Sequence, residues 1–256
     1  MDSQIYIYPD YSALSSAAAK LIALVINEAI AARGKCVIAL SGGETPRGVY
    51  ICLGTGPLNH EIDWSKVHIF FGDERMVPSD DAQSTFGMVK KELLSAISIP
   101  DKNVHRVWTE LSAYDAALAY EEELQIEMGY EIPQFDLILL GVGEEGHTAS
   151  LFPGTEALNE VGRSVSANFI PKLGSWRVTL TLPTINNARE ICFLVSGKLK
   201  AEIVEKVIDS ERPETHLPPT LIHPPNGRVK WILDADAASC LNLQKQQDRY
   251  TIVSKL

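Results

Sequence analysis

Cysteine is scarce in this sequence, and the few cysteines lie far apart. Four occur in 256 residues, at Cys36, Cys52, Cys192 and Cys240, and no two form a C-x-x-C pair. A disulfide framework or a thiolate zinc site needs cysteines grouped at short spacing. The sequence therefore predicts reduced thiols, a cytoplasmic location and no metal site.

A leader sequence, a membrane-spanning run and an excess of positive charge are also missing. The N-terminus, MDSQIYIYPD, lacks the basic and apolar segments of a secretory signal, and no uninterrupted apolar run approaches the ~20 residues of a transmembrane helix. Lys and Arg number 23 against 33 Asp and Glu, for a net charge of −10. Nucleic acid and anionic membranes would repel such a chain. We expect a soluble protein with neither as a partner, so an anionic ligand would need basic residues gathered locally.

Short, continuously apolar runs recur along the chain and predict strands buried on both faces of a parallel sheet. These runs are Cys36–Leu40, Val67–Phe71, Phe135–Leu140, Ile191–Val195 and Val229–Leu233. Helical periodicity between them predicts helices at Tyr11–Arg33, with Asp10 as N-cap and Gly34 at its end, and at about Thr45–Leu53, Thr85–Ala96, Ser112–Met128 and Lys198–Asp209. This alternation predicts one α/β domain over residues 1–256, with a three-layer, doubly wound, mostly parallel, Rossmann-like sheet. Two segments, Pro153–Arg177 and the proline-rich Leu217–Gly227, are predicted to be loops that shape or cover the site.

The first unusual strand end is SGGETP, Ser41–Pro46. Ligands of an open parallel sheet bind beyond the carboxyl ends of its strands, so such junctions are the first places to look for a site. Gly42 and Gly43 leave backbone amides facing outward, and the hydroxyls of Ser41 and Thr45 lie beside a helix N-terminus, an arrangement that suits phosphate. An ordinary strand-to-helix turn explains the same residues equally well.

A second junction, GDER, places Asp73, Glu74 and Arg75 after the strand Val67–Phe71. The planar donors of Arg75 match a phosphate or carboxylate. Three adjacent charges are also typical of a solvated loop, in which Asp73 caps the following element.

The most informative junction is GVGEEGHTASLFPG, Gly141–Gly154. A glycine-flanked histidine directly after a buried strand is expected to face the ligand crevice, and His147 is a natural general base for hydrolysis. Glu144 or Glu145 is placed to hold its other ring nitrogen. The alternative is a structural histidine that caps a helix beginning near Thr148. The G-x-G does not extend to the dinucleotide pattern G-x-G-x-x-G, so no nucleotide cofactor is predicted.

Further basic residues follow the later strands. Lys172 and Arg177 flank the loose segment, and Lys198 and Lys200 follow the strand Ile191–Val195. Lysines at a helix start are electrostatically unfavourable, which points to an anionic ligand nearby. Each lysine taken alone is more typical of a solvated surface.

Five motifs, SGGETP, FFGDER, GVGEEGHTASLFPG, KLGSWRVTLTLP and SGKLKA, resemble the 6-phosphogluconolactonase family in order and spacing, most strongly over Ser41 to Ala201. The related glucosamine-6-phosphate deaminases typically have D-E-Y where this chain has Asp73–Arg75, and G-H-I-A-F-N-E-P where it has Gly146–Pro153. The family pattern commonly has Asp-Gly-His, whereas this chain has Glu145 before Gly146, so direct contact of residue 145 with the histidine is open.

The resemblance implies a NagB-type fold, no cofactor, and hydrolysis of 6-phospho-D-glucono-1,5-lactone to 6-phosphogluconate, the second step of the oxidative pentose phosphate pathway. On this interpretation His147 activates water, with Asp73 and Glu145 as further catalytic candidates. The phosphosugar lactone is held by a set of polar and basic residues, namely Ser41, Gly42, Gly43, Thr45, Arg75, Lys172, Arg177 and Lys200. A covalent serine mechanism is disfavoured because Ser150 lies outside a G-x-S-x-G elbow. The alternatives are a glucosamine-6-phosphate deaminase/isomerase or a noncatalytic sugar-phosphate-binding module, and the protein is expected to be a monomer or small homo-oligomer.

Overall fold

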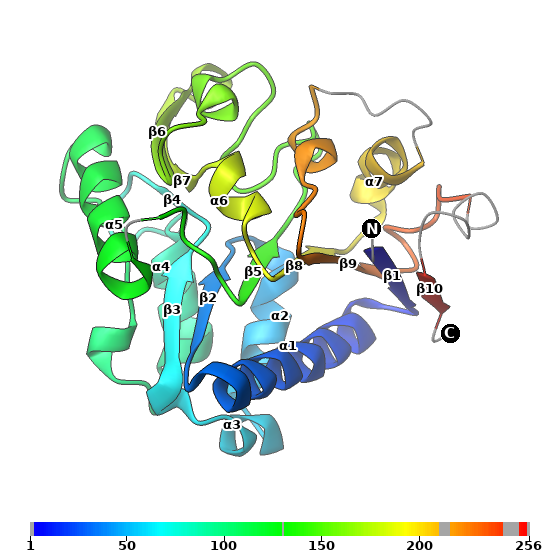
Figure 1. Ribbon diagram of the computed structural model, residues 1–256. Coiled ribbons are helices and arrows are strands. Elements are labelled where there is room, and N and C mark those ends of the chain that lie inside the picture. The colour runs from blue at the N-terminus through cyan, green and yellow to red at the C-terminus, as the bar shows by residue number, and fades with distance from the viewer. Residues whose placement is uncertain (1–2, 130, 210–215, 243–250, 255–256) are drawn as a thin grey trace.

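A seven-stranded sheet lies at the centre of the fold (Figure 1). The computed structural model describes residues 3–129, 131–209, 216–242 and 251–254. The strands lie in the order β10-β1-β9-β8-β5-β2-β3, and every neighbouring pair is parallel. They are β1 (Ser3–Tyr8), β2 (Cys36–Leu40), β3 (Val67–Phe71), β5 (Leu137–Leu140), β8 (Glu190–Val195), β9 (Arg228–Asp234) and β10 (Thr251–Ser254). The predicted parallel α/β sheet is confirmed, and β2 and β3 have the predicted bounds.

Both faces of the sheet are buried, which makes the fold three-layered. In β2, Cys36, Ile38 and Leu40 pack into one apolar cluster, whereas Val37 and Ala39 pack into the other. This division follows from the alternation of side chains along a strand. The first cluster is covered by α1 (Tyr11–Arg33), α2 (Glu44–Gly54), α3 (Pro57–Glu61) and α4 (Thr85–Val89), and the second by α5 (Ala113–Met128), α6 (Leu182–Asn186) and α7 (Ala201–Ile208).

Helix α1 has the predicted bounds and caps. The carboxylate of Asp10 accepts a hydrogen bond of 2.8 Å from the amide of Ala13, and Gly34 ends the helix in the left-handed region with φ of 80°. By length and composition alone α1 could cross a membrane, but half of its most apolar window is buried inside the domain. Its apolar face, which includes Leu14 and Ile22, packs against the sheet, so α1 serves as a core helix.

A second sheet corrects the predicted loop at Pro153–Arg177. Strands β4 (Asp73–Arg75), β7 (Ser175–Leu180) and β6 (Val165–Ile170) form an antiparallel sheet in the order β4-β7-β6. This sheet lies on the α5 side of the central sheet (Figure 1). Only part of each strand is apolar, and glycine and proline flank the hairpin, so the sequence pattern was too weak to predict strands.

Smaller differences affect element ends. The predicted helix Thr85–Ala96 is split into α4 and a π-helical turn at Lys90–Leu94. The strand predicted from Phe135 begins two residues later, because the Asp136 carboxylate is used to bind the amide of Val37 and the side chain of Arg33. Residues Lys198–Lys200 form a 3₁₀ turn before α7.

The site is positioned by the junction of β2 with β5. From β2 the chain crosses through α2 to β3 on one side, whereas from β5 it passes through the small sheet and α6 to β8 on the other. Two loops that leave adjacent strands in opposite directions open a crevice between them. This crevice lies between the turn Ser41–Gly43 and the turn Gly141–His147.

Candidate active site

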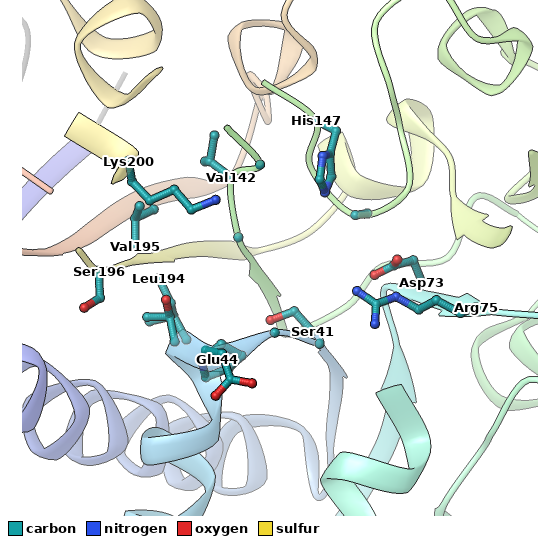
Figure 2. Close-up of a pocket in the computed structure, with 17 residues that line it drawn as sticks. Ser41, Glu44, Asp73, Arg75, Val142, His147, Leu194, Val195, Ser196 and Lys200 are labelled. Carbon is teal, nitrogen blue, oxygen red and sulfur yellow. The ribbon is translucent and has the colours of Figure 1, made fainter. Parts of the chain in front are cut away.

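A cavity of about 320 Å³ lies at the carboxyl ends of β2, β5 and β8. Figure 2 shows Lys200, Arg75 and His147 extending toward it from three separate elements. The cavity brings together most of the predicted site residues: Ser41, Gly42, Gly43, Thr45, Asp73, Arg75, His147 and Lys200. The crevice predicted from the strand ends is therefore present and contains both the imidazole and the glycine turn.

The imidazole of His147 packs closely against two neighbouring residues. It stacks on Phe152 with ring centroids 4.1 Å apart and an angle of 15° between the planes. Gly143 also lies close to the ring, and a methyl group added there would overlap Nδ1 and Cε1. Glycine at 143 is therefore required by the close approach of the ring. No helix begins at Thr148; instead the chain turns through Ala149, which has a positive φ of 47°.

Glu145 contacts the histidine despite the longer side chain. Its Oε2 lies 3.3 Å from Nδ1 of His147, although the two groups lack the alignment of a hydrogen bond. No hydrogen bond to Nε2 of His147 is found among the described residues, and the His147 side chain lines the cavity. Glu144 instead lies 3.9 Å from Nζ of Lys200. Of the two candidate carboxylates, Glu145 is the one beside the imidazole.

Burial controls the protonation of this pair. Removal from water lowers the pKa of His147 below 6.5, and Lys200 lowers it further, while the carboxylates of Glu145 and Asp73 raise it by less. For Glu145, burial raises the pKa, but its own backbone N–H, His147 and Lys172 together lower it by more. At neutral pH the histidine is therefore uncharged and the glutamate ionised, the states required of a base and its orienting partner.

The glycine turn presents unused donors to the cavity. The amides of Gly42, Gly43, Glu44 and Thr45 have no acceptor among the described residues, and α2 begins here without a side-chain cap. The hydroxyl of Ser41 is buried without a partner. The Ser41 amide differs from the others, because it donates to the hydroxyl of Tyr50 at 3.0 Å. The turn therefore suits an anion at its glycines and at the helix N-terminus.

Asp73 and Arg75 reach the cavity from β4. The Asp73 carboxylate accepts a hydrogen bond of 2.6 Å from the hydroxyl of Ser150. Nη1 of Arg75 donates to the carbonyl of Gln83 at 2.7 Å, whereas its Nε is buried without a partner. Part of the guanidinium is thus held in place and part remains available to a ligand.

The neighbouring Glu74 is turned away from the cavity. Its buried carboxylate accepts the amides of Arg75, Thr85 and Phe86, and the hydroxyl of Ser84. Burial raises the pKa of Glu74 in spite of these donors. The alternative that the charges of GDER form a solvated loop is therefore wrong for Glu74. Through these hydrogen bonds, Glu74 links β4 to the start of α4.

Two predicted binding residues do not line the cavity. Arg177 is buried on β7 opposite Arg75, and burial and the Arg75 charge lower its pKa, while Asp73 and Glu74 raise it by less. Lys172 lies in an exposed 3₁₀ turn, close enough to influence the carboxylate of Glu145. Both residues add positive charge near the site, but the geometry brings neither to the cavity wall.

Comparison with known proteins identifies the family. The family model described as glucosamine-6-phosphate isomerases/6-phosphogluconolactonase matches residues 9–231. The chain belongs to this family. A 6-phosphogluconolactonase of Mycobacterium tuberculosis is 39% identical over 249 residues, which cover 94% of this chain and 99% of the relative. The Synechocystis 6-phosphogluconolactonase is 40% identical over 221 residues, which cover 84% and 89%. The structure of 6-phosphogluconolactonase from Trypanosoma brucei has a TM-score of 0.85 at 30% identity, covering 94% of this chain and 99% of that one.

Family membership confirms the resemblance seen in the five motifs, and the structure adds residues that sequence reasoning missed. Asp234, at the end of β9, accepts hydrogen bonds from the hydroxyl of Ser196 and the amide of Gly197. It thereby fixes the turn that leads to Lys200. Tyr50 likewise hydrogen-bonds the backbone of Ser41, and Ser150 donates to the carboxylate of Asp73. The contacts of Asp234 and Ser150 join segments far apart in the sequence, and that of Tyr50 depends on how α2 folds back on the turn, so no motif signals them.

Proposed function

We propose that this chain hydrolyses 6-phospho-D-glucono-1,5-lactone to 6-phosphogluconate, the second step of the oxidative pentose phosphate pathway, with His147 as general base. The observation that carries the proposal is that a neutral imidazole and a cluster of unused anion donors face one cavity. The relatives named above make the chain a carboxylic ester hydrolase of the lactonase kind. A cytoplasmic location and a monomeric or small homo-oligomeric state remain part of the proposal.

In the proposed reaction, Nε2 of His147 removes a proton from a water molecule in the cavity. The resulting hydroxide attacks the lactone carbonyl, and the bond from that carbon to the ring oxygen breaks. The imidazolium then returns its proton to the leaving ring oxygen, so the base is regenerated. Glu145 supports this cycle by stabilising the imidazolium across the 3.3 Å contact at Nδ1. No serine nucleophile is needed, since the hydroxyl of Ser150 is used by Asp73.

The phosphate is proposed to bind at the glycine turn of the cavity. The free amides at the start of α2 supply donors there, and the Nζ of Lys200 and the guanidinium of Arg75 add positive charge at the cavity wall. These charges gather locally in a chain of net charge −10, as an anionic substrate requires. Holding the phosphate at a fixed distance from the base would place the lactone carbonyl beside the activated water.

The deaminase alternative is less consistent with the residues after the histidine. A deaminase needs a further acid–base carboxylate there, whereas this chain has Leu151, which is fully buried, and Phe152, which is stacked on the imidazole. A noncatalytic binding module would have no need for the neutral, cavity-facing imidazole of His147.

A direct assay separates the three functions. Fresh lactone or, in a parallel reaction, glucosamine 6-phosphate is added at low buffer concentration, and acid and ammonia are measured against the uncatalysed background. A lactonase releases acid, a deaminase acting on glucosamine 6-phosphate releases ammonia, and a binding module releases neither. The variant His147→Ala should lower kcat by ~10²–10⁴-fold, whereas the exposed His60, changed to Ala, is the matched control. Full activity in a folded His147→Ala protein would disprove the role of this base, and Asp73 would become the next candidate.

A further inference from the structure

A second group of titratable side chains lies at the edge strand of the sheet, away from the cavity. His68 lies near the start of β3, His105 follows the 3₁₀ turn Asp101–Asn103, and Glu127 is in the last turn of α5. Their ring nitrogens and carboxylate oxygen lie within 4.8 Å of one another. The cavity lies beyond the opposite end of β3, so this cluster is separate from the proposed active site.

The spacing of the three groups resembles that of ligands around one ion. Nδ1 of His68 lies 3.2 Å from Oε2 of Glu127 and 3.4 Å from Nε2 of His105. Tetrahedral ligands at the usual zinc–nitrogen distance of ~2.1 Å are separated by ~3.4 Å. Two of the three separations therefore fit a shared metal, and the third is within 4.8 Å.

Hydrogen bonds among the three side chains cannot satisfy all of their nitrogen and oxygen atoms at once. Nδ1 of His68 faces both Glu127 and the Nε2 of His105, but it carries at most one proton and can donate to only one of them. A cation between the three atoms would instead use a lone pair from each. The imidazole and carboxylate ligands present are those preferred by first-row transition metals.

A surrounding shell orients the ligands. Nδ1 of His105 lies 3.4 Å from Oε2 of Glu123, and the other oxygen of Glu123 accepts a hydrogen bond of 2.9 Å from Trp108. The His105 ring also stacks on Phe70, with centroids 4.1 Å apart. A carboxylate that binds the far nitrogen of a metal-bound histidine is a common feature of protein metal sites, because it fixes the tautomer and the ring.

One oxygen of Glu127 is left for the cluster, and the cluster can be reached from solvent. Lys35 donates to the second oxygen of Glu127, which leaves Oε2 toward the histidines. The three ligand side chains are 14–18% exposed, so an ion and a water molecule as fourth ligand have access from solvent.

We propose that His68, His105 and Glu127 bind a first-row transition-metal dication, for which Zn²⁺ is the probe, and that this metal fastens the C-terminal end of α5 to the edge strand β3. Tyr120 already ties the middle of α5 to the other end of that strand, through hydrogen bonds to both backbone groups of Phe71. The metal would supply a second attachment and have no part in the lactone chemistry.

Calorimetric titration of ZnCl₂ into the chelator-stripped, full-length chain tests the site. One zinc ion should bind per chain, and His68→Gln or His105→Gln should weaken binding by on the order of 100-fold or more, with Glu123→Gln weakening it ~10–100-fold. His60→Gln, an exposed histidine outside the cluster, should bind as the wild type does. The variant His147→Ala should also bind normally, which separates this site from the cavity. Unchanged zinc affinity in both cluster variants, or loss of binding in His147→Ala alone, would overturn the proposal.

Two further measurements keep the test independent of variant folding. Zinc at a hundredfold excess over its Kd should raise the Tm of the wild type by about 5–10 °C and leave lactonase activity unchanged. Cobalt bound in place of zinc should give visible d–d absorption without a thiolate charge-transfer band, because no cysteine is a ligand. Absence of the Tm shift at saturating zinc, or a thiolate band, would contradict binding at the histidines.

Discussion

The hydroxyl of Tyr50 uses both backbone groups of Ser41, donating to the carbonyl at 2.7 Å and accepting from the amide at 3.0 Å. The Ser41 amide is therefore already bonded, and the anion donors of the turn are the amides after it together with the Ser41 hydroxyl. Of the groups of Ser41, the hydroxyl is thus the one left for a ligand. Tyr50, from α2, thus fixes the geometry of the chain at the end of β2, the strand that precedes its helix.

Removal of the Tyr50 hydroxyl should loosen this turn. In Tyr50→Phe, a buried amide and carbonyl lose their partner, so the free energy of unfolding should fall by about 2–3 kcal/mol, measured by urea denaturation. The KM for the lactone should rise several-fold, because the glycine turn is no longer fixed. Tyr120→Phe is the matched control: it removes the same pair of hydrogen bonds from Phe71, which does not line the cavity, and should lower stability with a smaller effect on KM.

A methyl group at residue 143 should displace the proposed base. In Gly143→Ala the added carbon would overlap Nδ1 of His147, and a shift of ~1 Å in a catalytic group can cost ~10²-fold in kcat. Steady-state kinetics on freshly made lactone measure the effect. Gly162→Ala, at an exposed position with open surroundings and no positive φ, should behave as the wild type. A Gly143→Ala enzyme with unchanged kcat would show that the imidazole position has no influence on the rate.

Glu145 should affect the pH dependence of the reaction. The base works only when neutral, so activity falls as the pH drops through the pKa of His147, which burial lowers from its ordinary value. The charge of Glu145 raises that pKa, and Glu145→Gln should therefore move the acidic limb of kcat/KM to lower pH, by up to ~1 unit. Glu145→Asp should restore much of the original profile. An acidic limb that stays in place, or moves upward, would argue against this electrostatic coupling.

Two lysines separated by one residue test the phosphate side of the cavity. Lys200 lines the cavity, whereas Lys198 is exposed outside it. Loss of a charge-assisted contact of about 1.5–3 kcal/mol predicts that Lys200→Met raises KM by ~10–100-fold with a smaller change in kcat. Lys198→Met should leave both parameters unchanged. The KM of the wild type should also rise with salt, because screening weakens the attraction of the phosphate. Equal effects of the two substitutions would point to a diffuse charge effect.

The central sheet was predictable from sequence because its signal is strong and local. Strands such as Cys36–Leu40 are apolar at every position, which only burial on both faces allows. Strands β1 and β10 were missed, although β1 alternates polar and apolar residues; each lies near a chain end and depends on pairing with the rest of the sheet. The hairpin β6–β7 was missed because polar residues, including the buried Arg177, interrupt its pattern.

The candidate site was predictable to the extent that its residues follow buried strands. His147, Asp73 and the glycine turn come directly after apolar runs, and the parallel sheet brings those ends together. Lys172 does not line the cavity, and its position depends on the β6–β7 hairpin, which the sequence pattern does not predict. The supporting contacts of Tyr50, Phe152 and Asp234 depend on tertiary packing, which periodicity and spacing do not reveal.

The stacking of Phe152 on His147 limits how chemical reagents reach the imidazole. One face of the ring is covered by an apolar neighbour and the side chain is 28% exposed, so an electrophile that reacts with a ring-nitrogen lone pair must reach it through the cavity. Acylating reagents such as diethyl pyrocarbonate should therefore modify this histidine slowly, and a bound phosphosugar should protect it almost completely.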